Sequence, residues 1–269
     1  MKLDKSFKKK IISMKMKELK SLKDHFDLGL IRNASFSVGT DFFSAQMALN
    51  SHQSIPLIIP LQRRDLKSNK ELDNYDPFKM VRSLVKLKLL VFLIASDRQF
   101  LGGDPSHIKL AKIGSEVSVV QRDFFIDEVQ LYQAKSFGAD GVLLDADFLD
   151  STKLASFADI TFQLGLEPFL KIYSVSDLTH VEPEIVGGLI VEKDNADEIL
   201  TSDFYQKVKS MKHSQVPLIL SSSWFSRQEI ADFGERGIHH FVLDDTWLIR
   251  QNAIFELGRM VQHNWPDKE

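Results

Sequence analysis

The sequence has no cysteine among its 269 residues. Disulfide bonds, thiolate catalysis and zinc sites with cysteine ligands are therefore excluded, and a reducing compartment is the simplest setting for the chain. Long apolar runs are also missing, since none approaches the roughly 18 residues that a membrane-spanning helix needs. The N-terminus lacks the apolar core and the small residues of a signal peptide. We expect a cytoplasmic protein that makes no membrane contact.

An excess of charge of one sign is lacking as well. The 34 lysines and arginines against 37 acidic residues give a net charge of -3, so the overall charge predicts no nucleic-acid partner. A hydrophobic content of 43% and a mean hydropathy of -0.13 are typical of a globular protein. The length suits one large barrel or two modest domains, because single cores stop growing near about 250–300 residues.

The N-terminal segment is the exception to this even charge. Its first 23 residues hold nine lysines against Asp4 and Glu18, with apolar residues such as Phe7, Ile11 and Leu19 spaced between them. This pattern predicts an amphipathic helix with a solvated lysine face. We interpret it as a helix that caps the fold, and contact with an anionic membrane or with nucleic acid is the alternative.

The rest of the chain alternates between short apolar runs and helical patterns. Strands are predicted at residues 55–61, 89–96, 117–124, 141–145, 168–173, 188–191, 217–221 and 240–243. The helices that follow them are predicted at residues 77–86, 106–113, 127–137, 151–164, 175–180, 202–212, 226–236 and 251–263. A further short helix near residues 41–49 has Thr40 or Asp41 as its expected cap. Glycines suited to helix ends are Gly114, Gly138, Gly165 and Gly237.

Unbroken apolar runs are typical of parallel strands that are buried on both faces. Eight strand and helix pairs therefore predict a (β/α)8 TIM barrel with an N-terminal helical extension. We assign residues 1–50 to the extension, packed on the barrel, and residues 51–269 to the barrel itself. An open, doubly wound sheet is the alternative. No Gly-x-Gly-x-x-Gly follows the first strand, which counts against the dinucleotide-binding form of that sheet.

Several short motifs follow one another in a characteristic order between about Phe42 and Leu248. They are Asp76-Pro77, the run from Leu93 to Gly103, Arg122-Asp123-Phe124, Gly138-Ala139-Asp140 and Leu164-Gly165-Leu166-Glu167. In this order they resemble the indole-3-glycerol phosphate synthase family. The resemblance implies a barrel whose strand mouths, the carboxyl ends of its strands, hold an anthranilate-bearing ribulose phosphate. It also implies closure of a pyrrole ring with loss of carbon dioxide and water, which needs proton donors and a phosphate site.

The chain departs from the family pattern at the positions that carry this chemistry. The strand-one Glu-x-Lys falls on Pro60 and Gln62, the strand-three lysine on Arg122 and the strand-five glutamate on Lys171. The strand-six Asn-x-Arg falls on Ile190 and Glu192, the strand-seven Glu-Ser-Gly on Ser222, Ser223 and Trp224, and the strand-eight glycine turn on Asp244 and Asp245. An arginine can hold an anion but is a poor proton donor, and two carboxylates repel a phosphate.

Arg122 and Lys171 are the candidate catalytic replacements. The candidate substrate-binding positions are Gln62, Arg64, Asp97, Phe100, Phe124, Glu192, Ser222, Ser223, Asp244 and Asp245. Trp224 is expected to fill the pocket. No cofactor or metal is expected, although a cation cage made of Asp145, Glu192, Asp244 and Asp245 stays open as an alternative.

The sequence therefore favours a divergent barrel that has lost the ring-closing decarboxylation and acts as a binding or interaction protein. Its expected partners are a small anionic or aromatic ligand at the strand mouths and a protein of the tryptophan pathway. The alternatives are an active indole-3-glycerol-phosphate synthase, a decarboxylating lyase, or another phosphosugar enzyme with a rebuilt site.

Overall fold

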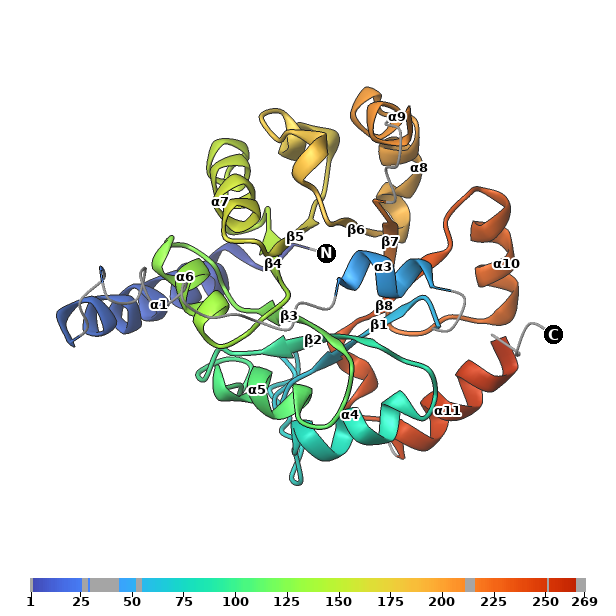
Figure 1. The fold of residues 1–269 in the computed structure, drawn as a ribbon, viewed down its shortest axis with the longest axis horizontal. Coiled ribbons are helices and arrows are strands. Elements are labelled where there is room, and N and C mark those ends of the chain that lie inside the picture. Colours follow the sequence, from blue (N-terminus) through green and yellow to red (C-terminus); the bar gives the residue numbers. More distant parts are fainter. Residues whose placement is uncertain are drawn as a thin grey trace.

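The protein is a closed barrel of eight parallel strands arranged in sequence order, as predicted (Figure 1). This computed structural model describes residues 2–25, 29, 44–51, 55–210, 216–250 and 252–264. The strands are β1 (Leu57–Leu61), β2 (Val91–Ala95), β3 (Ser118–Arg122), β4 (Gly141–Asp145), β5 (Glu167–Lys171), β6 (Gly188–Glu192), β7 (Leu218–Ser222) and β8 (His240–Leu243). The pairing of β1 with β8 closes the sheet, so the alternative of an open sheet is wrong.

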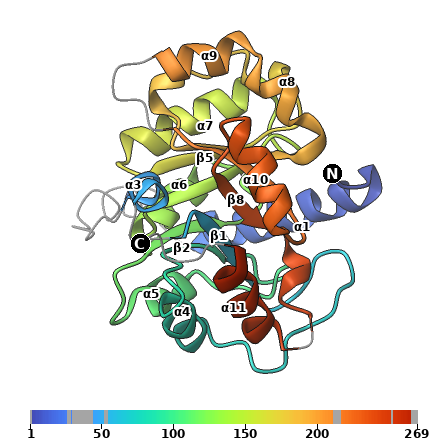
Figure 2. The ribbon, with the colours of Figure 1, turned by 90° about the vertical axis from the view of Figure 1, so that its right-hand side faces the viewer.

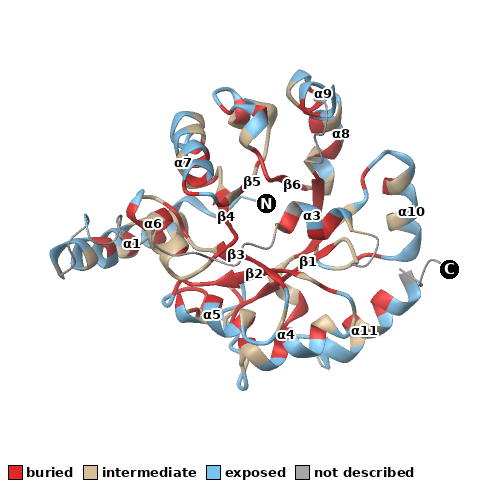
Figure 3. Ribbon diagram, in the orientation of Figure 1, coloured by how far each residue is buried: buried red, intermediate tan, exposed pale blue. Residues whose placement is uncertain are grey.

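Both faces of the barrel wall are buried (Figure 3). Side chains alternate between the two faces along each strand. Ile58, Val120 and Phe169 belong to a cluster inside the barrel, whereas Ile59 and Val119 pack under the surrounding helices. Burial on both faces explains why the strands could be recognised as unbroken apolar runs.

The helices around the barrel begin and end largely where the sequence predicts. They are α4 (Pro77–Val85), α5 (Ser106–Lys112), α6 (Val129–Ser136), α7 (Ser151–Gln163), α8 (Ala196–Leu200), α9 (Asp203–Ser210), α10 (Arg227–Glu235) and α11 (Ala253–Asn264). Asp76 caps α4 by accepting from the N–H of Lys79 at 3.1 Å, and Pro77 takes the first helical position. The four expected helix-end glycines all have positive φ, between 66° and 83°.

The connections after β5 and β6 differ from the prediction. The 3-10 turns η1 (Val175–Leu178) and η2 (Pro183–Ile185) replace the helix expected at residues 175–180. Asp177 accepts hydrogen bonds from the N–H groups of Tyr173 and Ser174 at 2.7 and 3.1 Å, which favours a tight turn over a longer helix. After β6 come η3 (Lys193–Asn195) and α8, which was not predicted, before α9. A last 3-10 turn, η4 (Asp245–Trp247), follows β8.

The two described N-terminal helices, α1 (Lys5–His25) and α3 (Ala45–Asn50), lie at opposite ends of the barrel (Figure 2). Helix α3 covers the amino ends of the strands, where Ala45, Ala48 and Leu49 join the interior cluster. The Glu167 carboxylate accepts from the N–H of Ala45 at 2.7 Å. The N-cap of α3 is Ser44, so the expected cap at Thr40 or Asp41 is wrong, and those two residues lie outside the described part of the chain.

Helix α1 lies beside the carboxyl ends of the strands, with Ile11 packed in a cluster that contains Ala95 and Phe124. The prediction of a wholly solvated lysine face is wrong at one position. Lys15 is 2% exposed, and its Nζ lies 2.8 Å from carboxylate oxygens of both Asp97 and Asp123. Within the described residues, no helix has the length and apolar character needed to cross a membrane.

Candidate functional site

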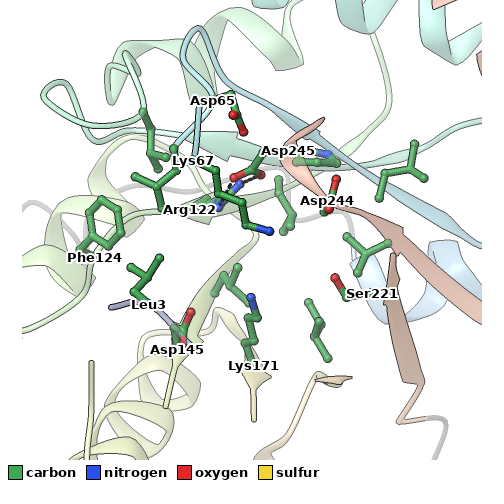
Figure 4. A pocket seen from close by; sticks show the side chains of 18 of the residues that line it. Leu3, Asp65, Lys67, Arg122, Phe124, Asp145, Lys171, Ser221, Asp244 and Asp245 are labelled. Carbon is green, nitrogen blue, oxygen red and sulfur yellow. Dashed lines mark hydrogen bonds and ion pairs between the residues drawn. The ribbon is translucent and has the colours of Figure 1, made fainter. Parts of the chain in front are cut away.

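A cavity of about 150 Å³ opens at the carboxyl ends of the strands, and we call it the mouth cavity (Figure 4). Its wall includes inward-facing strand residues, several of which lie two positions beyond a side chain of the interior cluster. Arg122 follows Val120 in this way, and Lys171 follows Phe169. Lys67 from the loop after β1 and Leu3 from the N-terminal segment complete the wall.

Arg122 is held in an ion pair across the mouth cavity. Both of its terminal nitrogens donate to the Asp245 carboxylate, one of them at 2.9 Å, and the two side chains are 19% and 16% exposed. Its Nη1 also donates to Gln62 Oε1 at 2.6 Å. Burial would raise the pKa of Asp245, but the charge and the hydrogen bonds of Arg122, together with smaller contributions from Gln62 and Lys171, outweigh burial and lower that pKa. The guanidinium is thus already occupied by a carboxylate.

A second set of charges lies on the β4 to β6 side of the cavity. Lys171 Nζ is 3.6 Å from a carboxylate oxygen of Glu192. The Tyr173 hydroxyl donates to Asp145 at 3.1 Å. Burial raises the pKa of Asp145, with Lys171 opposing the shift. Burial and then the Asp145 charge raise the pKa of Tyr173, which keeps its proton.

The cavity wall carries more negative than positive charge. Six carboxylates line it, against three cations. These are Asp65, Asp123, Asp145, Glu192, Asp244 and Asp245 against Lys67, Arg122 and Lys171. Asp65 and Asp123 are engaged elsewhere, by the Ser68 N–H and by Lys15. Among the described residues, Asp245 pairs with Arg122 and Glu192 lies near Lys171, so carboxylates already face two of the three cations and weaken the attraction of a dianion.

At the end of β7, a different serine from the two predicted ones faces the cavity. Ser221, not Ser222 or Ser223, lines the cavity, because successive strand side chains point to opposite faces. The Ser222 hydroxyl donates to the Trp224 carbonyl at 2.9 Å. Trp224 does not line the cavity, so the prediction that it fills the pocket is wrong. Its ring lies under the Arg250 guanidinium at 4.6 Å.

Three other predicted binding residues do not reach the mouth cavity. Asp97 is 1% exposed and accepts from the N–H groups of Phe100 and Leu101 at 2.6 and 3.0 Å, which fixes the loop after β2. Phe100 packs edge-to-face against Phe124, and Phe124 is a predicted residue that does line the cavity. Arg64 pairs with Glu71.

Six of the predicted site residues line the cavity: Arg122, Phe124, Lys171, Glu192, Asp244 and Asp245. Gln62 lies behind Arg122 and also donates to the Arg64 carbonyl at 2.9 Å. Asp244 accepts from the N–H and the hydroxyl of Thr246, at 2.9 and 2.5 Å, which caps η4. This second carboxylate at the strand-eight position is therefore tied to its own turn.

Two of the mouth residues that the sequence prediction missed are Leu3 and Tyr173. Leu3 lines the cavity, and its N–H donates to Asp147 Oδ2 at 2.9 Å. Lys8 pairs with the same carboxylate at 3.3 Å, so Asp147 holds the N-terminal segment beside the mouth. Tyr173 is the other, and its position two residues after inward-facing Lys171 was the available signal. Nothing in the local sequence pattern places Leu3, since that contact joins distant parts of the chain.

The described residues contain no group of three or more histidine or acidic side chains arranged to hold a metal ion. The cage considered for Asp145, Glu192, Asp244 and Asp245 does not form, because these side chains turn to different partners. Asp245 pairs with Arg122, Glu192 lies near Lys171, and Asp145 accepts from Tyr173.

A closed eight-stranded parallel barrel with a charged cavity at its carboxyl end defines the class of (β/α)8-barrel proteins. The solved structure of 3-hexulose-6-phosphate synthase from Salmonella typhimurium shares this fold, with a TM-score of 0.52, 15% identity, and coverage of 79% of this chain and 100% of that one. The indole-3-glycerol phosphate synthase family model matches residues 8–254. The chain belongs to that family.

It is a divergent member. The indole-3-glycerol phosphate synthase of Paracidovorax citrulli (strain AAC00-1) is 22% identical over 260 residues, covering 93% of this chain and 97% of that protein. The enzyme of the same name from Bacteroides thetaiotaomicron is 34% identical over 142 residues, covering 53% and 54%. The resemblance seen in the sequence motifs is thereby confirmed at the level of the family.

Proposed function

We propose that this chain has lost the ring-closing decarboxylation of its family and acts as a binding or interaction protein. The observation that carries the proposal is the bidentate pair between Arg122 and Asp245 in a cavity whose carboxylates outnumber its cations. A site for a phosphate-bearing substrate needs unpaired donors and net positive charge. This mouth offers neither at the Arg122 position.

The proton chemistry supports the same conclusion. An arginine pairs with a carboxylate without giving up a proton, so Arg122 cannot replace a lysine as general acid. The pKa of Arg122 is raised further by Asp245, which outweighs the lowering effect of burial. Removal of one transition-state donor from an enzyme site typically costs about 10²–10³ in rate. Several such positions have changed here.

The mouth cavity suits an aromatic ligand better than an anionic one. Leu3, Leu143, Phe124 and Phe148 supply apolar surface to its wall, and the described charged residues of the wall include more carboxylates than cations. We therefore favour an uncharged aromatic molecule among the ligands expected there. We also propose a protein partner from the tryptophan pathway, a cytoplasmic location, and no membrane or nucleic-acid partner.

The direct test is turnover of carboxyphenylamino-deoxyribulose phosphate by the purified chain, followed by the fluorescence of the indole product. We expect a rate at least about 10⁴-fold below an ordinary enzymatic turnover of about 10 per second. A family enzyme assayed in parallel verifies the substrate. Turnover near the ordinary rate, abolished by Lys171→Met, would overturn the proposal.

A second candidate is a different enzyme with a rebuilt mouth, which one observation favours. Asp145 lines the cavity, accepts from Tyr173, and has its pKa raised by burial. A perturbed carboxyl in a cleft is a common feature of general acids. Turnover of any member of a phosphosugar panel, with loss of that turnover in Asp145→Asn, would favour this candidate.

A further inference from the structure

Helix α1 borders a groove outside the mouth cavity. Two adjoining hollows of about 740 and 490 Å³ share Met14 and Gln99 and run between α1 and the loops that follow β1 and β2. We call these hollows together the basic groove. Its lining includes the six cations Lys2, Lys10, Lys17, Arg64, Lys67 and Arg98, against only Asp4 and Glu18. Positive charge gathers here although the whole chain has a net charge of -3.

Both acidic residues of the basic groove already have partners. Asp4 Oδ1 accepts from the N–H groups of Ser6 and Phe7 at 2.8 and 3.2 Å, at the start of α1. Glu18 lies 2.9 Å from Nζ of the buried Lys15. Neither carboxylate forms a described ion pair with a lysine that lines the groove, so neither of them neutralises the positive charge of these four lysines.

The α1 side of the basic groove is one face of the helix. Phe7, Lys10, Met14 and Lys17 follow a spacing of three, four and three residues, which places them in one stripe. Phe7 packs edge-to-face against Phe100 at a centroid distance of 5.9 Å. The groove therefore combines apolar side chains with a cationic rim.

The lysines of this face are available for a ligand. Lys10 and Lys17 are exposed, and neither forms an ion pair with any residue that the structure describes. The arginines differ, because Arg64 pairs with Glu71, and Arg98 pairs with Asp104 at 2.7 Å. Binding of an anion at Lys10 and Lys17 would thus break no described ion pair.

We propose that the basic groove binds an acidic, partly apolar segment of a partner protein. The proposal rests on the interaction role proposed above and names the chemistry of the partner. Lys10 and Lys17 are separated by about 10 Å along the helix axis. This distance is about one three-residue turn of a polyproline II segment, in which every third side chain lies on the same side. A segment with acidic residues at that spacing and apolar residues between them matches both the rim and the floor of the groove.

A protein segment fits this groove better than a nucleic acid does. Single-stranded nucleic acids bind by stacking their bases on exposed aromatic faces. The two phenylalanines of the groove instead pack against each other, and Phe100 also packs against Phe124 at 5.9 Å. Because the groove and the mouth cavity share Leu3, Leu66 and Lys67, a bound segment would lie at the entrance to the cavity.

The test is fluorescence anisotropy with a labelled peptide of about 12 residues that repeats Glu-Leu-Ser, which repeats the acidic group every third residue. We expect saturable binding that weakens as salt rises, since exposed charges are screened. The double variant Lys10→Glu, Lys17→Glu should weaken binding about tenfold or more. The matched control Lys9→Glu, Lys20→Glu reverses two exposed lysines of α1 that do not line the groove and should change binding less than about twofold.

Several results would overturn the proposal: no saturable binding up to about 1 mM peptide, equal weakening by both double variants, or equal binding of the peptide with glutamine for glutamate. Tighter binding of a single-stranded oligonucleotide would also contradict it. Turnover of the phosphate substrate is measured on the same samples. Peptide binding together with ordinary turnover would overturn only the proposed loss of activity, whereas absence of both would overturn only the groove.

Discussion

Arg122 and Asp123 are neighbours at the end of β3, yet their side chains lie in two different environments. Arg122 faces into the barrel and pairs with Asp245 at the wall of the cavity, where both side chains keep 16% to 19% exposure. Asp123 meets Lys15 at 2.8 Å beneath α1, where the exposures are 8% and 2%. The two ion pairs have the same chemistry but different access to water.

Because of this difference, one ion pair stabilises the fold and the other determines what the cavity can bind. Lys15 is surrounded by Asp97, Asp123 and Glu18, and their charges outweigh burial and raise its pKa. It thereby anchors α1 to the loop after β2 and to the end of β3. We call Lys15 with its three carboxylates the outer cluster, and the Arg122–Asp245 ion pair the inner pair. The inner pair neutralises Arg122 and lies at the wall of the mouth cavity. The outer cluster should therefore dominate stability, and the inner pair should dominate anion binding.

The largest expected effect is the loss of the outer cluster in Lys15→Met. The substitution leaves Asp97 and Asp123 buried without their cation, which typically costs about 3–5 kcal/mol. Chemical denaturation should show that decrease in the free energy of unfolding. The control Lys20→Met, on the exposed face of the same helix, should change it by less than about 0.5 kcal/mol. A loss below about 1 kcal/mol in Lys15→Met would remove the contrast between the two environments.

The inner pair should respond more weakly to Asp245→Asn. Because cavity water can solvate the freed guanidinium, we expect a loss of about 1–3 kcal/mol in the free energy of unfolding. The same variant should gain binding of inorganic phosphate, measured by calorimetry, since Arg122 then has free donors. Asp244→Asn is the matched control and removes a charge that does not contact Arg122. An equal gain of phosphate binding in both variants would contradict the assigned role of the pair.

The smallest effect is expected at the amino ends of the strands, where the half-buried His240 pairs with no charged group that the structure describes and serves as a reference for both ion pairs. Burial, with a smaller contribution from His239, lowers the pKa of His240 from 6.5 to about 4. The unfolded chain then takes up the proton first, so stability is lost as the pH falls from about 6.5 to about 4.

Between pH 7 and 5 this amounts to about 1–2 kcal/mol. Thermal unfolding of wild type and His240→Gln across that range measures it, and the variant should lose less stability on acidification. Glutamine can still donate to Asn50, the residue that lies 3.2 Å from His240 Nε2. Identical pH profiles would show that the imidazole is not the titrating group.

The sequence predicts the barrel because its signals are local. Unbroken apolar strands, the Asp76-Pro77 cap and the helix-end glycines each act within a few residues, and the structure has all of them. Features that depend on distant contacts were not predicted. Lys15 is buried because Asp97 and Asp123, which follow β2 and β3, contact it. The sequence of its own segment contains no sign of these contacts and therefore predicts a solvated helix.

The sequence predicted which residues lie at the site better than it predicted how they contact one another. Arg122 and Lys171 line the cavity as predicted, but at the end of β7 the residue that lines it is Ser221, not the predicted Ser222 or Ser223. The pairing of Arg122 with Asp245 joins β3 to the turn after β8 across the barrel, and no local pattern contains that information.

The most direct measurement is a calorimetric titration of the wild-type chain with carboxyphenylamino-deoxyribulose phosphate. If Asp245 neutralises Arg122 and the remaining cavity carboxylates repel the phosphate, no saturable binding will appear up to about 1 mM ligand. A dissociation constant of about 1 μM, lost in Arg122→Met, would contradict the account, because it would place the phosphate substrate in the mouth cavity with Arg122 as its partner.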